Sequence, residues 1–281
     1  MLSREEYVEQ AYFFRVLVER LGQNLPLQEL LEQTRHELLA TTKLPMAIDL
    51  MLAELKHRGQ MSSGMALLKH YFSPFQTFII AEAETDRGRF DYRTALRILA
   101  AEAEYRSREI NLQGLFFFQF EAMSRNRLNY DRGLKALAED PAFNADWRTW
   151  MLNVRRQLGL VDIADMIYAR SELFRQRAMQ TGETRPLDPV LFGIQEGKIA
   201  QANRRKDTQY LFAAMQRHLG YPAVPRQEPV DTLPSLIPQI QRRLERLEAR
   251  MKLFEEEQRG GIDITKFYAG KAPAPPDDLL R

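Results

Sequence analysis

In the stretch Pro45-Met-Ala-Ile-Asp-Leu-Met-Leu-Ala-Glu-Leu-Lys-His-Arg-Gly59, apolar residues recur every three or four positions. This spacing places them on one face of an α-helix; they are Ala47, Ile48, Met51, Leu52 and Leu55. Proline suits the first turn of a helix, because the N–H group that it lacks has no partner there. Glycine suits the end, because it adopts the left-handed conformation at little steric cost. The stretch therefore predicts an amphipathic helix with defined ends.

The residues after Gly59 begin a pattern that recurs along the chain: Gly, an apolar residue two positions on, and then Ser or Asp. The pattern occupies 59–62, 88–91 and 159–162, and Tyr130-Asp131 repeats it without the glycine. The glycine would end one helix, and the Ser or Asp side chain would accept hydrogen bonds from the first N–H groups of the next. We therefore expect helix N-caps at Ser62, Asp91, Asp131 and Asp162.

Strand signals are scarce in this chain. Val and Ile are few, alternation with a period of two is not sustained, and no Asn-Gly or Asp-Gly turn separates apolar runs. We therefore predict an all-α protein. The expected N-caps fall roughly 30 to 40 residues apart, close to the length of a helical-hairpin repeat. Two architectures stay open: an irregular multi-helix bundle, and a short α-solenoid-like stack of helical hairpins, of which 147–174 would be the clearest.

A change of composition near Gly220 predicts the domain organisation. Residues 1–220 are expected to form a packed α-helical body. The segment 221–234 contains Pro222, Pro225, Pro229 and Pro234, which predict an extended linker because proline disrupts helix interiors. A long amphipathic helix is expected at 235–259, followed by a flexible tail at 260–281 that begins with two glycines.

Composition excludes several classes of protein. Lys and Arg number 40 against 38 Asp and Glu, so the net charge of +2 lacks the excess that is typical of nucleic-acid or membrane-surface proteins. The absence of Cys excludes disulfides, thiolate zinc sites and cysteine nucleophiles. The most apolar stretch, 112–120, is far shorter than the roughly 20 apolar residues of a membrane-spanning helix. With no secretory signal recognisable, we expect a cytoplasmic protein that contacts no membrane and holds no cofactor.

The strongest single pattern lies in the helix expected at 235–259. Its apolar residues follow spacings of 3, 4, 3, 4 and 3 positions; they are Ile237, Ile240, Leu244, Leu247, Met251 and Phe254. This is a heptad seam, typical of a helix that pairs with another helix. Because it covers under three heptads, an alternative is that the helix folds back onto its own body. We expect self-association or binding of a partner helix, with that alternative left open.

The charges that flank the seam favour a parallel pair. With Ile237 at heptad position a, Arg243 and Arg250 fall at position g, and Glu248 and Glu255 fall at position e of the following heptad. Parallel copies would therefore pair Arg with Glu twice, whereas antiparallel copies would bring Arg near Arg. Exposed pairs of this kind contribute only tenths of a kcal/mol each. The pattern thus indicates orientation more than affinity.

A basic stretch at 198–206 suggests an alternative function. Its cations are Lys198, Arg204, Arg205 and Lys206, which would be suited to binding phosphate or another anion. Two features oppose nucleic-acid binding: Glu196 and Asp207 lie close by in the sequence, and no aromatic residues are interleaved with the cations. Solvent-exposed helix ends are the ordinary explanation of such a stretch.

An enzyme is the third class considered. Glu54 and His57 form one Glu-x-x-His pair, but a di-iron bundle requires two such pairs. Two further carboxylate pairs, Glu82 with Glu84 and Glu102 with Glu104, could face one another across a helical hairpin, although salt bridges with nearby arginines are the ordinary explanation. No Gly-x-Ser-x-Gly, Ser-x-x-Lys or His-Glu-x-x-His motif is present. We predict no catalytic residue and no metal ligand.

These patterns favour a non-enzymatic cytoplasmic scaffold or adaptor. The body would support the helix at 235–259, which would bind a protein partner or a second copy of the chain. Nucleic-acid or phosphate binding through 198–206, and an enzyme with a carboxylate and histidine site, are the alternatives.

Overall fold

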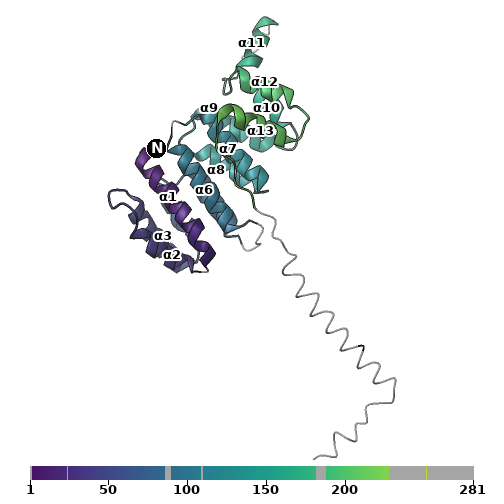
Figure 1. The fold of residues 1–281 in the computed structure, drawn as a ribbon. Helices are drawn as coiled ribbons and strands as arrows, with labels where there is room; N and C mark the ends of the chain where they lie inside the picture. The colour runs from purple at the N-terminus through teal and green to yellow at the C-terminus, as the bar shows by residue number, and fades with distance from the viewer. Residues whose placement is uncertain are drawn as a thin grey trace, which may run out of the picture. The chain divides into compact units, whose positions relative to one another are not determined.

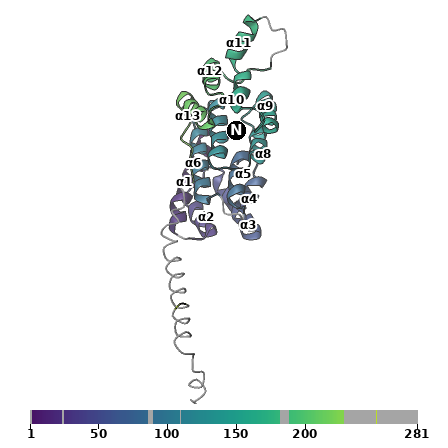
Figure 2. The ribbon, with the colours of Figure 1, turned by 90° about the vertical axis from the view of Figure 1, so that its right-hand side faces the viewer.

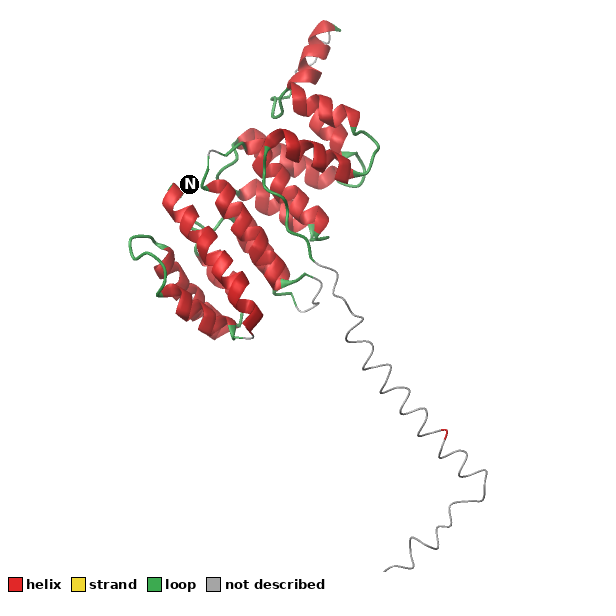
Figure 3. Ribbon diagram, in the orientation of Figure 1, coloured by secondary structure: helices red, strands yellow, loops and turns green. Residues whose placement is uncertain are grey.

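A computed structural model describes residues 2–23, 25–85, 90–108, 110–181, 188–227 and 251. Within these residues the chain forms thirteen α-helices and no β-strand, as the ribbon coloured by secondary structure shows (Figure 3). The described residues also form two isolated β-bridges, one between Leu158 and Val161 and one between Ser171 and Phe192. The prediction of an all-α protein is confirmed.

The helices are short and follow one another closely. Their bounds are α1 Arg4–Arg20, α2 Leu27–Arg35, α3 Leu44–Arg58, α4 Met61–Leu67, α5 Pro74–Ala83, α6 Tyr92–Arg106, α7 Leu112–Arg125, α8 Tyr130–Glu139, α9 Ala145–Gln157, α10 Ile163–Ala169, α11 Glu172–Gln180, α12 Ile194–Ala202 and α13 Thr208–Leu219. A single 3₁₀ turn, Leu21–Gln23, follows α1.

Most helices of the body pack against the next helix in the chain, and a few pairings join helices that are distant in sequence. Three of these are α1 with α6, α5 with α8 and α7 with α13. Figure 1 shows α6 beside α1. From the side, α1, α6 and α13 lie along one side of the body, and α3, α4, α5, α8 and α9 lie along the other (Figure 2). The prediction of a helical hairpin at 147–174, which would pair α9 with α10, is wrong. Helix α9 packs mainly against α8, and α10 packs mainly against α12.

Helix ends agree in part with the expected caps. Asp91 and Asp162 are the N-caps of α6 and α10, and each carboxylate accepts a backbone N–H of the first turn. The other two expectations are wrong: α8 is capped by Asn129, and α4 begins at Met61 after Gln60. Gly59 ends α3 in the left-handed conformation, with a φ of 72°, as the sequence predicted.

The core is continuous through the body and is rich in aromatic side chains. Phe116, Phe117 and Phe118 on α7 are fully buried. The ring centroid of Phe116 lies 4.9 Å from that of Trp150 on α9, and Phe192, just before α12, lies 5.1 Å from Trp150. An aromatic cluster therefore joins α7 and α9 to the segment that leads into α12.

The compact unit of the body extends to Gln227. Residues 221–227, where the sequence predicts the start of a linker, pack against the body without forming a helix: Tyr221 is 3% exposed and its hydroxyl donates to Glu121 Oε2 at 2.7 Å. Asn126 fixes the end of this segment, because its side chain donates to Pro225 O and accepts from Gln227 N. The remaining linker, the helix at 235–259 and the tail lie outside the described residues, except for Met251.

No helix among the described residues combines the length and the apolar character that crossing a membrane requires.

Candidate functional site

Three helices line an open groove on the surface of the body. α5 packs against both α4 and α8, and each of the three helices presents one face to the groove. The lining positions include Ser62, Ala66 and Lys69 on α4 and the turn after it, Pro74, Thr77, Phe78 and Ala81 on α5, and Arg132, Lys135, Ala136 and Glu139 on α8. Steps of three or four positions are the spacing of one side of an α-helix. The groove is therefore lined by one side of each of the helices α4, α5 and α8. We call it the α5 groove.

The α5 groove consists of two adjoining hollows of about 480 Å³ and 340 Å³, which share Ala66, Thr77, Ala81 and Arg132. Three of these four side chains are short, so the space above α5 stays open. Buried Phe72 and Phe78 form part of the apolar floor of the smaller hollow.

The rim of the smaller hollow is predominantly basic. Lys69, Arg132 and Lys135 line it, together with the single carboxylate of Glu139. The Arg132 side chain is 57% exposed, and its Nη1 lies 3.1 Å from Glu82 Oε1. The Nζ of Lys135 lies 4.0 Å from Glu139 Oε1, at the limit of an ion pair, and both groups are exposed. The Lys135–Glu139 pair is exposed on both sides and therefore weak, whereas Arg132 is held by Glu82, whose side chain is only 16% exposed.

Glu84 closes the larger hollow at the other end of α5. Its carboxylate accepts hydrogen bonds from Met61 N at 2.6 Å and from Ser62 N at 3.1 Å, and also from the Ser62 hydroxyl. The first free N–H groups of α4 are thus satisfied by a residue of the helix that follows it. This carboxylate joins the end of α5 to the start of α4.

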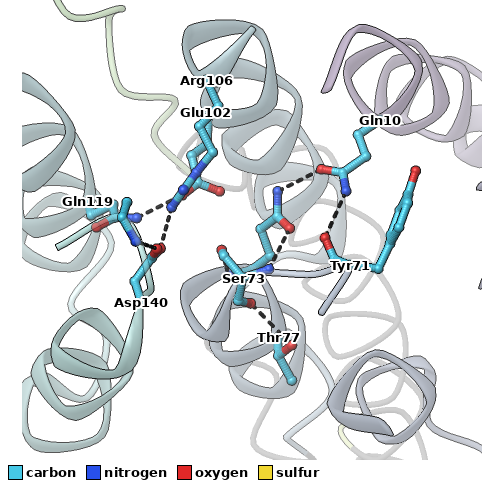
Figure 4. Close-up of polar contacts among 10 residues, drawn as sticks. Gln10, Tyr71, Ser73, Thr77, Glu102, Arg106, Gln119 and Asp140 are labelled. Carbon is cyan, nitrogen blue, oxygen red and sulfur yellow. Dashed lines mark hydrogen bonds and ion pairs between the residues drawn. The ribbon is translucent and has the colours of Figure 1, made fainter. Parts of the chain in front are cut away.

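A buried charge cluster lies inside the body (Figure 4). Arg106 on α6 donates to Glu102, one turn earlier, and to Asp140 in the turn between α8 and α9. Gln119 on α7 donates to the same Glu102 oxygen at 2.7 Å. The side chains of Arg106, Glu102 and Asp140 are at most 2% exposed. The cluster therefore joins α6, α7 and the end of α8 through charge-assisted hydrogen bonds.

Burial raises the pKa of the Glu102 carboxyl above its ordinary value of 4.5; nearby Arg106 opposes this shift and Asp140 adds to it. Two acceptor atoms of the cluster, Glu102 Oε2 and Gln119 Oε1, are buried without a hydrogen-bond partner. That arrangement fits a carboxyl that retains its proton to a higher pH than usual. Arg106 also lines a surface hollow of about 530 Å³, together with Leu2, Tyr7 and Ile110, and neither Glu102 nor Asp140 lines that hollow.

A second, uncharged polar cluster joins α1 to the start of α5 (Figure 4). Gln10 Nε2 donates to Tyr71 O, and Gln76 Nε2 donates to Gln10 Oε1, both at 3.1 Å. Gln76 and Ser73 form a capping box at the first turn of α5. Both polar clusters hold helices in place, because their atoms are bonded to one another inside the body.

The carboxylates that the sequence singled out have separate partners. Glu82 pairs with Arg132, Glu84 caps α4, Glu102 lies in the buried cluster and Glu104 pairs with Arg108 at 2.6 Å. On α3, Glu54 pairs with Arg58 while His57 is exposed. Among the described residues no group of three or more His, Asp or Glu side chains is arranged to hold a metal ion.

The basic stretch 198–206 spans the end of α12 and the turn before α13. Arg204 is held by Asp165 at 2.6 Å and lies over the Tyr168 ring at 4.1 Å from its centroid. Arg205 donates its backbone N–H to Asp162 at 2.6 Å. Lys198 and Lys206 are exposed. Of these four cations, Arg204 is therefore already paired with the Asp165 carboxylate and the Tyr168 ring, whereas the side chains of Lys198 and Lys206 are exposed.

The heptad seam falls almost entirely outside the described residues. Met251 is its one described member; it is helical and its side chain is 64% exposed. Ile237, Ile240, Leu244, Leu247 and Phe254, and the flanking Arg243, Glu248, Arg250 and Glu255, lie outside them.

Sequence reasoning did not identify the α5 groove or the buried cluster. A signal for the cluster was present on α6, where Glu102 and Arg106 continue the apolar face of Ala95 and Leu99 at helical spacing. A charged pair on a buried face predicts an internal partner, here Asp140. The groove gave no comparable signal, because it requires knowing that α4 and α8 flank α5.

The chain matches no known family model, and comparison with curated proteins and with solved structures also finds no match.

Proposed function

We propose that the protein is a non-enzymatic cytoplasmic scaffold that self-associates, or binds a partner helix, through its segment 235–259. The observation that carries the proposal is the heptad spacing of Ile237, Ile240, Leu244, Leu247, Met251 and Phe254. Apolar side chains at positions a and d of successive heptads bury one another when two helices pair. The 64% exposure of Met251 is consistent with such a role.

The buried carboxylates of the body are bonded to other side chains of the body, and this supports a structural role for them over a catalytic one. The buried carboxylates Glu102 and Asp140 are bonded to Arg106, and Glu121 is bonded to Arg125 and Tyr221. The Arg106–Asp140 contact joins α6 to the end of α8, and the Tyr221–Glu121 contact joins the 221–227 segment to α7. We further propose that the body is an irregular multi-helix bundle, because α1–α6 and α7–α13 join helices that are distant in the chain.

The proposed pairing is parallel, because Arg243 and Arg250 then face Glu248 and Glu255 of the other helix. We expect the double variant Arg243→Glu with Arg250→Glu to self-associate less than the native chain, because the dimer would then contain four pairs of opposed carboxylates. The reverse double variant, Glu248→Arg with Glu255→Arg, should be weakened in the same way. An equimolar mixture of the two should form heterodimers, which native mass spectrometry distinguishes by mass.

The matched control is Arg242→Glu with Arg246→Glu, which introduces the same charge at positions outside the flanks of the seam. This variant should self-associate as the native chain does. If both double variants and the control behave alike, or if the mixture forms no heterodimer, parallel pairing through this seam is wrong.

A further inference from the structure

We propose that Met251 is a site of reversible oxidation, at which a peroxide switches self-association of the chain off. The inference rests on the proposed pairing of the segment 235–259 and adds a means of regulating that same seam. It is carried by the chemistry of sulfur in this chain, by the exposure of its methionines and by the place of Met251 in the heptad pattern.

Sulfur chemistry in this chain belongs to methionine alone. The sequence contains 11 Met and no Cys. A peroxide therefore cannot form a disulfide or a sulfenic acid here, and its product at sulfur is methionine sulfoxide. Reductase enzymes return this sulfoxide to methionine, so the change is reversible.

Burial divides the methionines that the structure describes into two groups. Met46, Met179 and Met251 are 76%, 61% and 64% exposed. The other described methionines are at most 8% exposed; they are Met51, Met61, Met65, Met123, Met151, Met166 and Met215. Because the peroxide must reach the sulfur atom, it reacts with the exposed group first.

Met251 differs from the other two exposed methionines in its place in the chain. Met46 belongs to α3 and Met179 to α11, so both are part of the body. With Ile237 at heptad position a, Met251 also falls at position a, two heptads later. Side chains at position a of a parallel pair pack against one another, so the two Met251 side chains of a dimer would meet in one layer of the seam.

The oxidation is a transfer of one oxygen atom. The sulfur of Met251 attacks one oxygen of hydrogen peroxide, an S–O bond forms and the O–O bond breaks. The sulfur is oxidised by two electrons, and the second oxygen leaves as water with both protons of the peroxide. In the reverse step a reductase dithiol is oxidised to a disulfide, and the sulfoxide oxygen leaves as water.

The sulfoxide is unsuited to the apolar seam. Its oxygen accepts hydrogen bonds and donates none, so two sulfoxides in one layer cannot satisfy each other. The neighbouring seam residues Leu247 and Phe254 have apolar side chains and supply no donor. We expect oxidation of Met251 to weaken self-association by about tenfold or more, since a buried acceptor without a partner is costly.

Pairing and oxidation oppose each other. In a dimer the two Met251 side chains would cover one another, whereas in the single chain this side chain is 64% exposed. The peroxide therefore reacts with the single chain, and the oxidised chain stays single because it binds a second copy more weakly. The state of Met251 then sets the share of chains that pair.

The first test measures the oxidation rate of each methionine. The full chain is treated with hydrogen peroxide at several protein concentrations, and peptide mass spectrometry follows the gain of one oxygen. Met46 and Met179 should react at the same rate at every concentration. Met251 should react comparably fast when the protein is dilute and more slowly as the protein is concentrated, because pairing covers it. A Met251 rate independent of concentration would contradict the pairing itself, and the proposal with it.

The second test measures mass by light scattering after oxidation. The oxidised native chain should have the 32.8 kDa mass of one chain, and treatment with methionine sulfoxide reductases for both sulfoxide epimers should restore the dimer. Met251→Leu should stay dimeric in peroxide, because Leu244 shows that leucine suits position a of this seam.

The matched control is Met46→Leu with Met179→Leu, which removes the other two exposed methionines and leaves Met251. This variant should dissociate in peroxide as the native chain does. A dimer that persists after Met251 is fully oxidised, or a Met251→Leu dimer that dissociates in peroxide, would overturn the proposal and leave self-association intact.

Discussion

At the scale of single residues, the body is held by charged groups that lie where apolar side chains would be expected. Arg106 is enclosed with Glu102, Asp140 and Gln119, and taking such groups out of water is unfavourable unless they pair. The cluster contains two carboxylates for one guanidinium, and burial raises the pKa of Glu102. A buried cluster of this composition makes stability depend on pH.

The sign of this dependence follows from the raised pKa of Glu102. Because the folded state holds the proton more tightly than the unfolded state, whose pKa is near 4.5, stability falls as pH rises from 4.5 to the folded-state pKa and then levels off. Glu102→Gln keeps an oxygen for Arg106 and cannot titrate. The free energy of unfolding of Glu102→Gln minus that of the native protein should therefore increase with pH across this window, as measured by urea denaturation.

The control for this experiment is Glu104→Gln, which removes one carboxylate from the exposed side of the same helix. If the difference between Glu102→Gln and the native protein stays constant with pH, or falls as pH rises, Glu102 does not carry a raised pKa in the folded protein.

At the scale of helices, local sequence predicted the elements better than it predicted how they meet. Asp91, Asp162 and Gly59 act within one or two turns of their own helix, and their roles were read correctly. The cap of α4 comes from Glu84, 22 positions after Ser62, and no local pattern reports such a contact. The α5 groove was missed for the same reason, since its three faces come from helices that are brought together only by the fold.

The approach of α4 to α3 gives a test at this scale. A Cβ atom added to Gly64 on α4 would lie 2.7 Å from the Met51 Cα on α3, a backbone atom that cannot move without shifting the helix. Gly64→Ala should therefore lower the free energy of unfolding by roughly 1–3 kcal/mol, as overpacked sites do. Chemical denaturation of the full chain measures this. The control is Gly22→Ala, where an added Cβ meets only Arg93 Nη2 at 4.0 Å; equal stability of the two variants would contradict close packing of α3 on α4.

At the scale of the whole molecule, the all-α class was predictable because helix periodicity and caps recur throughout 1–220. The body extends to Gln227, since Tyr221 is buried and Asn126 bonds the backbone of residues 225 and 227. A run of prolines indicates only that no helix forms; it does not reveal that a non-helical segment packs against Glu121 and Phe212. The pairing of the seam at 235–259 stays a prediction.

The solution mass of the full chain, measured by light scattering over a range of concentrations, is the decisive quantity for self-association. The native chain and Ala249→Asp, which introduces a charge opposite the seam, should both have twice the 32.8 kDa mass of one chain. Leu247→Asp, which introduces the same charge into the seam, should have the mass of a single chain. A native chain that stays at 32.8 kDa at every concentration would contradict self-association through residues 235–259.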